Sequence, residues 1–320
     1  MTSPSTANPE RSRVAVIIPC YNEAESIGRT VGDFMAALPG AAVYVYDNNS
    51  RDGTAEAARQ AGAIVRFERT QGKGQVVRRM FADVEADVYV LADGDATYDS
   101  ASAATMVEAL VAQRLDMVVG SRVAVDTLAY RRGHRLGNRM LTVLLAWIFG
   151  RSFTDILSGY RVFSRRFVKS FPVLSTGFEI ETEMSVHALE LRMPVAEILT
   201  PYLPRGEGSQ SKLNTYRDGW RILTTIINLF RSEKPLTFFL LAAGAIALGA
   251  VILAVPLLVT YLDTGLVPRL PTAVLATGLA ILAALSTFAG LILDTVVRGR
   301  REMRRLAYLA YPAPGSGEYP

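Results

Sequence analysis

Two long apolar runs near the carboxyl end constrain this chain more than any other feature. Leu236–Leu262 and Pro271–Val297 consist almost wholly of apolar and small residues, whereas residues 14–231 have the mixed composition of a water-soluble domain. A helix rises 1.5 Å per residue, so each run gives roughly 40 Å of helix, enough to cross a hydrocarbon core about 30 Å thick. A helical hairpin buried in a soluble core is the alternative, but the length of both runs favours two membrane-spanning helices.

The residues beside these runs predict the orientation of the hairpin. A short turn at 263–270 joins the runs, so the outer ends of both helices lie on one side of the membrane. Positive charges collect on the cytoplasmic side of spanning helices. We therefore expect a multi-pass protein of the cytoplasmic (inner) membrane, with its N-terminal domain and its C-terminus in the cytoplasm. The positive residues at the two outer ends are Arg231, Lys234, Arg298, Arg300, Arg301, Arg304 and Arg305.

Composition divides the rest of the chain into further segments. Met1–Arg13 is polar and lacks the apolar region of a secretory signal, so we expect a disordered lead-in. Apolar residues alternate with arginines in 214–235, which predicts an amphipathic helix in the lipid headgroup region, although a core-facing helix has the same pattern. The expected order is a lead-in at 1–13, a soluble domain at 14–213, the amphipathic helix at 214–235, the hairpin at 236–297 and a basic cytoplasmic tail at 298–320.

The net charge of +4 and the single cysteine exclude some classes of protein. The arginines cluster beside the apolar runs, which indicates a membrane surface or phosphate ligands. The basic and aromatic repeats of nucleic-acid-binding proteins are missing, so we expect no nucleic-acid partner. Cys20 cannot form an intramolecular disulfide, and its place after Val16–Pro19 predicts a small buried residue rather than a reactive thiol.

Strand-like runs alternate with helical patterns in the soluble part. Such alternation predicts a mostly parallel α/β sheet with right-handed crossovers, in which ligands bind at the carboxyl ends of the strands. Asn22, with Glu25 three residues later, predicts a capping box at the start of the first helix. The expected strands are Val14–Pro19, Ala42–Tyr46, Asp87–Ala92 and Met117–Gly120, the last of them after a helix at Ser102–Gln113.

The sharpest chemical signal is Asp93-Gly94-Asp95, directly after the third of these strands. Two carboxylates separated by one residue can approach the same hard cation, and Mg²⁺ binds through one or two carboxylates together with substrate phosphates. A metal there offsets the charge that develops on a diphosphate leaving group. The alternative is an ordinary turn, because Asp-Gly pairs are common in turns.

A second polar segment, Asp47–Thr54, ends the second strand and begins a helix. A carboxylate in this place can accept hydrogen bonds from a nucleobase N–H or from a ribose hydroxyl. The alternative is that Ser50 or Asp52 caps the helix, and this structural role is compatible with nucleotide binding. Gly72-Lys73-Gly74 lacks the earlier glycine and the following Ser or Thr of a phosphate-binding P-loop, which we therefore reject.

Taken together, these motifs resemble those of family 2 glycosyltransferases of GT-A fold. The set is similar to dolichyl-phosphate mannose synthases and to bacterial polyprenyl-phosphate glycosyltransferases. The bacterial members commonly carry a C-terminal membrane hairpin. The resemblance covers roughly residues 14–215 in order. The segments that carry it are Ile17–Glu23, Asp47–Thr54, Gly72–Gly74, Asp93–Asp95, Gly120–Arg122, Asp155–Arg161, and Arg205 followed by Ser211–Lys212–Leu213.

The resemblance implies a set of site residues. The fifth residue of the usual Asp-x-Asp-Leu-Gln motif is Thr97 here, which puts any role of that Gln in doubt, and Phe178–Glu181 replaces a basic segment, which leaves the sugar pocket unassigned. The implied residues are Pro19, Tyr21, Glu23, Asp47, Asn49, Lys73 and Asp93 for the nucleotide; Asp93 and Asp95 for Mg²⁺ or Mn²⁺; Arg122, Arg131, Arg205 and Lys212 for phosphates of acceptor or donor; and Asp155, Asp95 and Arg122 for catalysis.

The reaction that the resemblance implies is transfer of a hexose from a UDP- or GDP-linked sugar to a polyprenyl phosphate, with inversion. A phosphate monoester has a second pKa near 6 and is largely a dianion at neutral pH, so we expect Asp155 to orient a substrate or a basic side chain rather than to act as an indispensable base. Arg131, Arg132 and Arg135 are further candidates for acceptor phosphate, or else form a solvated basic loop.

Two other functions stay open. The enzyme could use another lipid or glycan acceptor, or the chain could be a nucleotide-binding subunit of a membrane assembly or transport system. Few ionisable residues lie in the spans, which disfavours transport, and two spans hardly form the channel of a processive synthase. Small residues such as Gly244 and Gly249 permit close helix packing and hence a homo-oligomer.

Overall fold

The computed structural model describes residues 13–124, 142–143, 145–150, 153–175, 177, 179–203, 224 and 227–315 of the chain. It divides into two compact units, one of Met1–Gly219 with Met303–Pro320 and the other of Trp220–Glu302. Most of the expected tail at 298–320 therefore belongs to the first unit. The expected lead-in, except Arg13, and most of the expected amphipathic helix at 214–235 lie outside the described residues.

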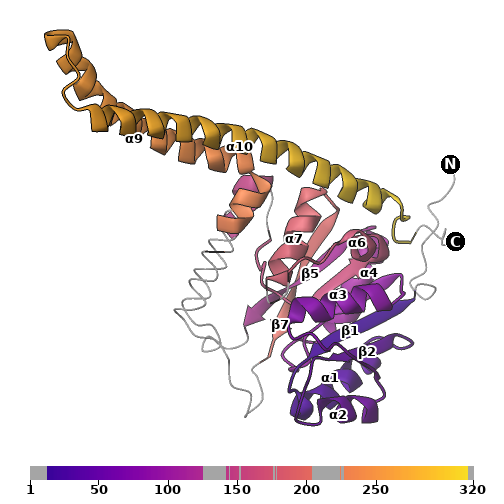
Figure 1. Ribbon diagram of the computed structural model, residues 1–320. Coiled ribbons are helices and arrows are strands. Elements are labelled where there is room, and N and C mark those ends of the chain that lie inside the picture. The colour runs from indigo at the N-terminus through magenta and orange to yellow at the C-terminus, as the bar shows by residue number, and fades with distance from the viewer. Residues whose placement is uncertain are drawn as a thin grey trace, which may run out of the picture. The chain divides into compact units, whose positions relative to one another are not determined.

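A seven-stranded sheet with the order β3-β2-β1-β4-β6-β5-β7 forms the centre of the first unit (Figure 1). Neighbouring strands are parallel except β6, which runs antiparallel to both β4 and β5, so the mostly parallel α/β fold is confirmed. The antiparallel strand was not expected. The strands are β1 (Val14–Cys20), β2 (Ala42–Asp47), β3 (Ile64–Phe67), β4 (Val88–Leu91), β5 (Met117–Ala124), β6 (Arg161–Ser164) and β7 (Val195–Tyr202).

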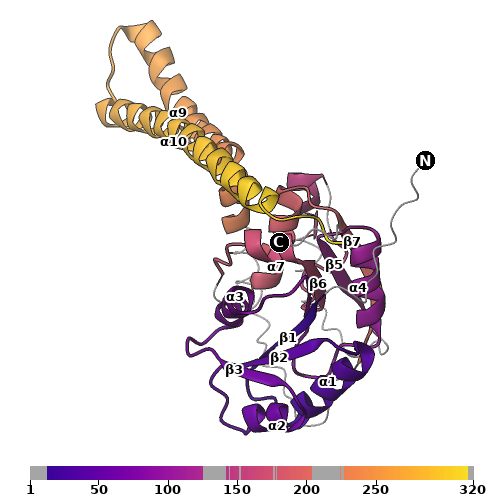
Figure 2. The same cartoon turned by 90° about the vertical axis from the view of Figure 1, so that its right-hand side faces the viewer.

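Helices cover both faces of this sheet (Figure 2). The nearly continuous apolar sequence of β1 is typical of a strand that is buried on both sides. Val16 and Ile18 pack with residues of α1, α2 and α4 in one core, while Phe81 of α3 meets Phe163 of β6 on the other face, with ring centroids 5.8 Å apart. The helices of this unit are α1 (Ala24–Ala37), α2 (Thr54–Gln60), α3 (Lys73–Asp83), α4 (Ser102–Ala112), α6 (Arg165–Ser170) and α7 (Ile180–Glu190).

The expected capping box of α1 is wrong. Asn22 has a positive φ of 53° and its side-chain oxygen accepts a hydrogen bond from the Arg51 N–H at 2.9 Å. The Ala24 N–H at the helix start instead donates to the Asp52 carboxylate at 3.0 Å, and the Glu23 N–H donates to the Thr54 hydroxyl at 2.9 Å. The cap thus comes from the loop after β2, which ties the β1 and β2 loops together.

The second unit is a helical hairpin of α9 (Pro235–Thr264) with the Leu270–Glu302 part of α10 (Leu270–Leu309) (Figure 1). Both helices are long and apolar enough to cross a membrane. A core hairpin of a soluble protein would be mostly buried, but the most apolar windows of α9 and α10 are only 11% and 17% buried in the described chain. This exposure favours lipid as the surrounding medium.

Small residues line the contact between the two helices. Ala243 and Ala250 of α9 and Ala276 and Ala283 of α10 are buried at seven-residue spacing. A Cβ on Gly290, which continues this series, would lie 2.9 Å from the Cβ of Phe239. Close backbone approach of this kind is typical of helices packed within a membrane.

The outer ends of the hairpin are joined by arginine contacts. Arg301 donates to the Glu233 carbonyl at 3.0 Å and forms an ion pair with the Glu233 carboxylate at 3.1 Å. Arg300 donates to the Ser232 carbonyl at 3.4 Å. The two ends therefore lie side by side, as the short connecting turn predicted. Asp294, near the exit of the second run, pairs with Arg298 one turn later at 2.8 Å.

The segment after the hairpin forms part of the first unit. The hydroxyl of Tyr308 donates to the fully buried carboxylate of Asp116 at 2.9 Å, and Arg166 also donates to that carboxylate, at 2.8 Å. Arg304 pairs with Glu190 in the same region. Asp116 directly precedes β5, so this contact lies at the start of that strand. We call it the Tyr308–Asp116 contact below.

Tyr308→Phe should destabilise the first unit by about 1 to 3 kcal/mol, because a buried carboxylate then loses a hydrogen-bond donor. The measurement is thermal unfolding of the full chain in detergent. Tyr311→Phe is the matched control, since the side-chain contact described for Tyr311 is made by its ring, 5.8 Å from the Arg165 guanidinium, and is kept in the variant. Equal unfolding midpoints for the two variants would contradict the inferred contribution of the hydroxyl.

His187 gives the same unit a pH dependence. It is buried between Phe167 and Phe171, and its Nδ1 has no hydrogen-bond partner among the described residues. Burial, with a smaller effect of the Arg304 charge, lowers the pKa of His187 to about 3. The unfolded chain therefore takes up a proton near pH 6.5 that the folded chain does not, so stability falls as the pH drops below 6.5.

Between pH 7 and pH 5 this difference should cost the wild type about 2 kcal/mol more than it costs His187→Gln, which cannot be protonated. Unfolding midpoints of the two proteins at both pH values measure it. The comparison between proteins cancels the titration of the carboxylates that they share. If both lose stability in parallel, the buried neutral histidine is not the cause.

Candidate active site

Polar residues from four strands meet at one edge of the sheet. Asp47 ends β2, Asp93 follows β4 and Arg122 lies in the second half of β5. Asp155 comes before β6, and because β6 is antiparallel, its start lies beside the ends of its neighbours: Arg161 pairs with Leu91 of β4 and Val119 of β5. The expected position of Asp47 and Asp93 at the carboxyl ends of their strands is therefore confirmed, and the antiparallel β6 explains how Asp155 joins them.

Asp47 presents a buried carboxylate oxygen that has no hydrogen-bond partner in the described chain. The residue is 3% exposed. Its Oδ2 accepts from the Ser50 N–H at 3.2 Å, while Oδ1 has no donor among the described residues. Buried acceptors are normally satisfied, so this oxygen is suited to a ligand N–H or O–H. Pro19, which pairs with the residue before Asp47, and the half-exposed Tyr21 lie on the adjacent strand end.

Asn49, a second predicted nucleotide residue, has a loop contact of its own. It has a positive φ of 66°, and its side-chain amide donates to the Arg69 carbonyl at 2.9 Å. The neighbouring Asn48 donates to the carbonyls of Glu68 and Thr70, both at 2.9 Å. The two asparagines thus hold the loop that leads to Lys73. The structure thus shows a loop contact of Asn49, and its role in nucleotide binding stays a prediction.

Lys73 lies between two carboxylates. Its ammonium is 2.6 Å from Asp93 and 2.6 Å from Glu181 of α7. Burial alone would lower the pKa of Lys73, but the attraction of Asp93 and then of Glu181 raises it above its ordinary value. The side chain therefore stays charged and neutralises part of the acidic site. Glu181 belongs to the segment whose role the sequence left open, and only the folded chain shows that it reaches Lys73.

Asp95 and its turn pack closely against β1. Asp95 is buried, and its Oδ1 accepts from the Thr97 N–H at 3.3 Å and the Thr97 hydroxyl at 2.6 Å. A Cβ on Gly94 would lie 2.5 Å from the sulfur of Cys20, so a larger residue between the two aspartates would have to displace this buried thiol. Cys20 is buried, as expected, and its packing role here explains why.

The two aspartates fit a hard divalent cation. Carboxylate oxygens are the ligands that Mg²⁺ and Mn²⁺ prefer, and Asp93 and Asp95 lie on one turn. The described residues contain no group of three or more His, Cys, Asp or Glu side chains that could hold a metal. Mg²⁺ held by two carboxylates commonly completes its coordination with water and phosphate oxygens of a ligand.

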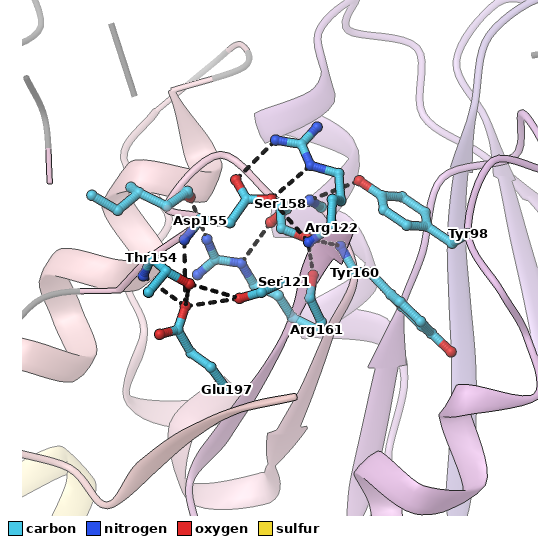
Figure 3. Close-up of polar contacts among 12 residues, drawn as sticks. Tyr98, Ser121, Arg122, Thr154, Asp155, Ser158, Tyr160, Arg161 and Glu197 are labelled. Carbon is cyan, nitrogen blue, oxygen red and sulfur yellow. Dashed lines mark hydrogen bonds and ion pairs between the residues drawn. The ribbon is translucent and has the colours of Figure 1, made fainter. Parts of the chain in front are cut away.

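Arg122 and Asp155 form the clearest ion pair of the site (Figure 3). Two guanidinium nitrogens donate to the two carboxylate oxygens at 2.7 and 2.9 Å, and the Arg122 N–H adds a third contact at 3.3 Å. The guanidinium also lies over the ring of Tyr202, 5.5 Å from its centroid. A carboxylate engaged in this way orients an arginine, which supports the expected orienting role of Asp155.

The loop after Asp155 touches the aspartate turn directly. The Gly159 N–H donates to the Tyr98 hydroxyl at 3.0 Å. A Cβ on Gly159 would lie 2.9 Å from the Asp93 carboxylate and 3.1 Å from the Lys73 ammonium. The site is thus one continuous cluster. Arg131, Arg205 and Lys212, the remaining predicted phosphate ligands, lie outside the described residues.

Comparison with known proteins identifies the class. The sequence profile of glycosyl transferase family 2 matches residues 15–171. The glycosyltransferase AglJ of Haloferax volcanii is 37% identical over 233 residues, 72% of this chain and 76% of that protein. An uncharacterised Shigella flexneri protein is 52% identical over 155 residues, 48% of this chain and 95% of its own. The chain therefore belongs to glycosyltransferase family 2.

A more distant relative and a solved structure extend this picture. A dolichyl-phosphate hexose transferase of Haloferax volcanii is 27% identical over 222 residues, 69% of this chain and 95% of that protein. Glucosyl-3-phosphoglycerate synthase from Mycobacterium tuberculosis, solved with Mn²⁺, uridine-diphosphate-glucose and phosphoglyceric acid, has a TM-score of 0.57 at 20% identity, covering 69% of this chain and 79% of that one. This likeness shows that the first unit has the GT-A fold.

Gly159→Ala should lower glycosyltransferase turnover by roughly tenfold or more, because its Cβ would push into Asp93 and Lys73, and a small displacement of residues at the site can cost a large factor in rate. Gly28→Ala makes the same chemical change in α1, where a Cβ meets nothing within 4 Å, and is the matched control. Turnover of Gly159→Ala equal to that of Gly28→Ala would show that the loop does not need its close contact with Asp93.

Proposed function

We propose that this protein transfers a hexose from a UDP- or GDP-linked sugar to a polyprenyl phosphate. The observation that carries the acceptor is the apolar helical hairpin, because an enzyme with its own membrane segment lies where a long-chain lipid phosphate is found. The relative named as a dolichyl-phosphate hexose transferase supports the same acceptor class. The arginines at the outer ends of the hairpin favour the cytoplasmic face of the inner membrane for the catalytic unit.

In this proposal the donor nucleotide binds at the edge of β1, β2 and β4. The Asp47 oxygen that has no partner among the described residues accepts a hydrogen bond from the base or the ribose, next to Pro19 and Tyr21. Asp93 and Asp95 would hold Mg²⁺ or Mn²⁺, and such a cation would supply positive charge to offset the negative charge of a diphosphate leaving group. Lys73, charged and beside Asp93, adds a fixed positive charge at the same place.

The acceptor phosphate is assigned to Arg122. A guanidinium binds phosphate through two parallel hydrogen bonds, and Asp155 keeps this one oriented at the sheet edge. The acceptor is largely a dianion at neutral pH, so one of its oxygens can attack the anomeric carbon without a base. The new bond joins that oxygen to the anomeric carbon, the bond from this carbon to the diphosphate breaks, and in-line displacement inverts the configuration.

The test is a lipid-product assay. Purified full-length protein is incubated with a polyprenyl phosphate, Mg²⁺ or Mn²⁺, and a panel of UDP- and GDP-linked hexoses. The masses of the extracted lipids are then measured by mass spectrometry. One chelator-sensitive product with the mass of lipid phosphate plus one hexose is expected. If a nucleotide sugar binds but no such lipid forms with any donor, the acceptor assignment is wrong, and a glycan or other lipid acceptor replaces it.

Asp95→Asn should abolish metal-dependent turnover while the fold persists. The amide keeps an oxygen for the contact with Thr97 but loses the charge that holds a cation. Asp99→Asn is the control from the same loop, because Asp99 accepts from Ser102 at the start of α4. Turnover and thermal unfolding are measured for both variants. Full activity of Asp95→Asn would remove Asp95 from the metal site.

A further inference from the structure

We propose that Glu197 of β7 is a positioning residue for the transfer reaction, because one of its carboxylate oxygens fixes the Arg122–Asp155 pair from outside the site. The activity part of this inference rests on the proposed function. None of the motifs of the sequence includes Glu197, and its strand was not among the expected ones. In the fold, β7 pairs with β5, which carries Arg122, so Glu197 lies on the neighbouring strand.

A single oxygen of Glu197 accepts several hydrogen bonds. Oε1 accepts from the Ser121 hydroxyl at 2.8 Å, from the Thr154 N–H at 2.8 Å and from the Thr154 hydroxyl at 3.0 Å. The Asp155 N–H adds a longer contact to the same oxygen at 3.4 Å. Figure 3 shows the contacts of Glu197 with Ser121 and with Thr154. All partners are donors, so the oxygen acts as an acceptor only.

The two main partners of Glu197 are the neighbours of the ion pair. Ser121 directly precedes Arg122, and Thr154 directly precedes Asp155. By binding both, Glu197 sets the distance between the strand that carries the guanidinium and the loop that carries the carboxylate. A bidentate ion pair requires that distance to be held closely, because both guanidinium hydrogen bonds have to form at once.

The same loop is held from its other side by Arg161. This arginine is fully buried, and it donates to the carbonyls of Ile156 at 2.6 Å and Ser158 at 2.9 Å and to the Ser185 hydroxyl at 2.9 Å. Burial lowers its pKa to about 10, so it remains charged at neutral pH. Glu197 thus satisfies N–H groups at the start of the loop, and Arg161 satisfies carbonyl groups further along it.

Because Glu197 acts here as a hydrogen-bond acceptor, two variants can separate the loss of its charge from the loss of its accepting oxygen. Glu197→Gln retains a side-chain oxygen of the same reach, whereas Glu197→Ala removes it. If Glu197 positions the loop, the glutamine variant should keep most of the wild-type turnover, and the alanine variant should lose roughly tenfold or more in kcat. Because the nucleotide edge is formed by β1, β2 and β4, the KM for the nucleotide sugar should change by about twofold at most in either variant.

Glu183→Ala is the matched control. Its carboxylate also accepts from two backbone N–H groups, those of Leu174 at 2.9 Å and Ser175 at 2.8 Å, on a different loop. Glu183→Ala therefore measures how much turnover and thermal stability are lost when a glutamate that accepts from backbone N–H groups is removed away from the Arg122–Asp155 pair. Turnover near wild type is expected for Glu183→Ala, with a change in thermal midpoint similar to that of Glu197→Ala.

Hydrogen exchange of the full-length protein in detergent gives a readout that does not need the reaction. A peptide spanning 153–161 should exchange faster in Glu197→Ala than in the wild type, and at the wild-type rate in Glu197→Gln and Glu183→Ala. Unchanged exchange in Glu197→Ala overturns the proposal, and so does wild-type turnover of that variant. A glutamine variant as inactive as alanine also overturns it, because charge would then matter instead of the oxygen. If the wild type makes no glycolipid but the exchange pattern holds, the proposed function fails and the role of Glu197 in holding the loop stands.

Discussion

The antiparallel insertion of β6 between β4 and β5 is the constraint on which the site depends. In a purely parallel sheet the residues before a strand lie at the edge opposite the ligands. Because β6 runs the other way, the segment from Asp155 to Tyr160 reaches the carboxyl edge, beside the aspartate turn after β4. Arg161, at the start of β6, then anchors that segment from inside the sheet. One reversed strand thus supplies both the carboxylate and its support.

Charge balance is the second organising principle of the site. Lys73 is neutralised by Asp93 and Glu181, and Arg122 by Asp155, so each of these cations is held in place by carboxylates. Buried charges that lack partners are costly, which explains why the site is paired internally. A phosphate or metal ion that enters the site therefore meets side chains that already have a partner of opposite charge. These ion pairs set the orientation of each side chain before the ligand binds.

The sequence was informative where the signal was local. The apolar runs of β1, β2 and β4 and of both hairpin helices were long enough to recognise, and the polar loops at the strand ends followed from the α/β pattern. The capping residue of α1 could not be predicted, because the Ala24 N–H donates to Asp52, which lies 28 residues away in sequence. Glu181 and Glu197 escaped for the same reason. The partner of each comes from a distant element, Lys73 for Glu181 and Thr154 for Glu197, and no spacing in the sequence connects them.

The course of the chain also bears on how the hairpin and the catalytic unit depend on each other. The first unit consists of residues on both sides of the hairpin in sequence, since Met303–Pro320 belongs with Met1–Gly219. The returning segment is bound through the Tyr308–Asp116 contact and through Arg304 and Glu190, which are specific polar contacts with buried carboxylates. A chain shortened before Met303 would therefore lose the hairpin's second connection and also expose Asp116 with one donor fewer. The hairpin is consequently an insertion into the catalytic unit rather than an appendage at its end.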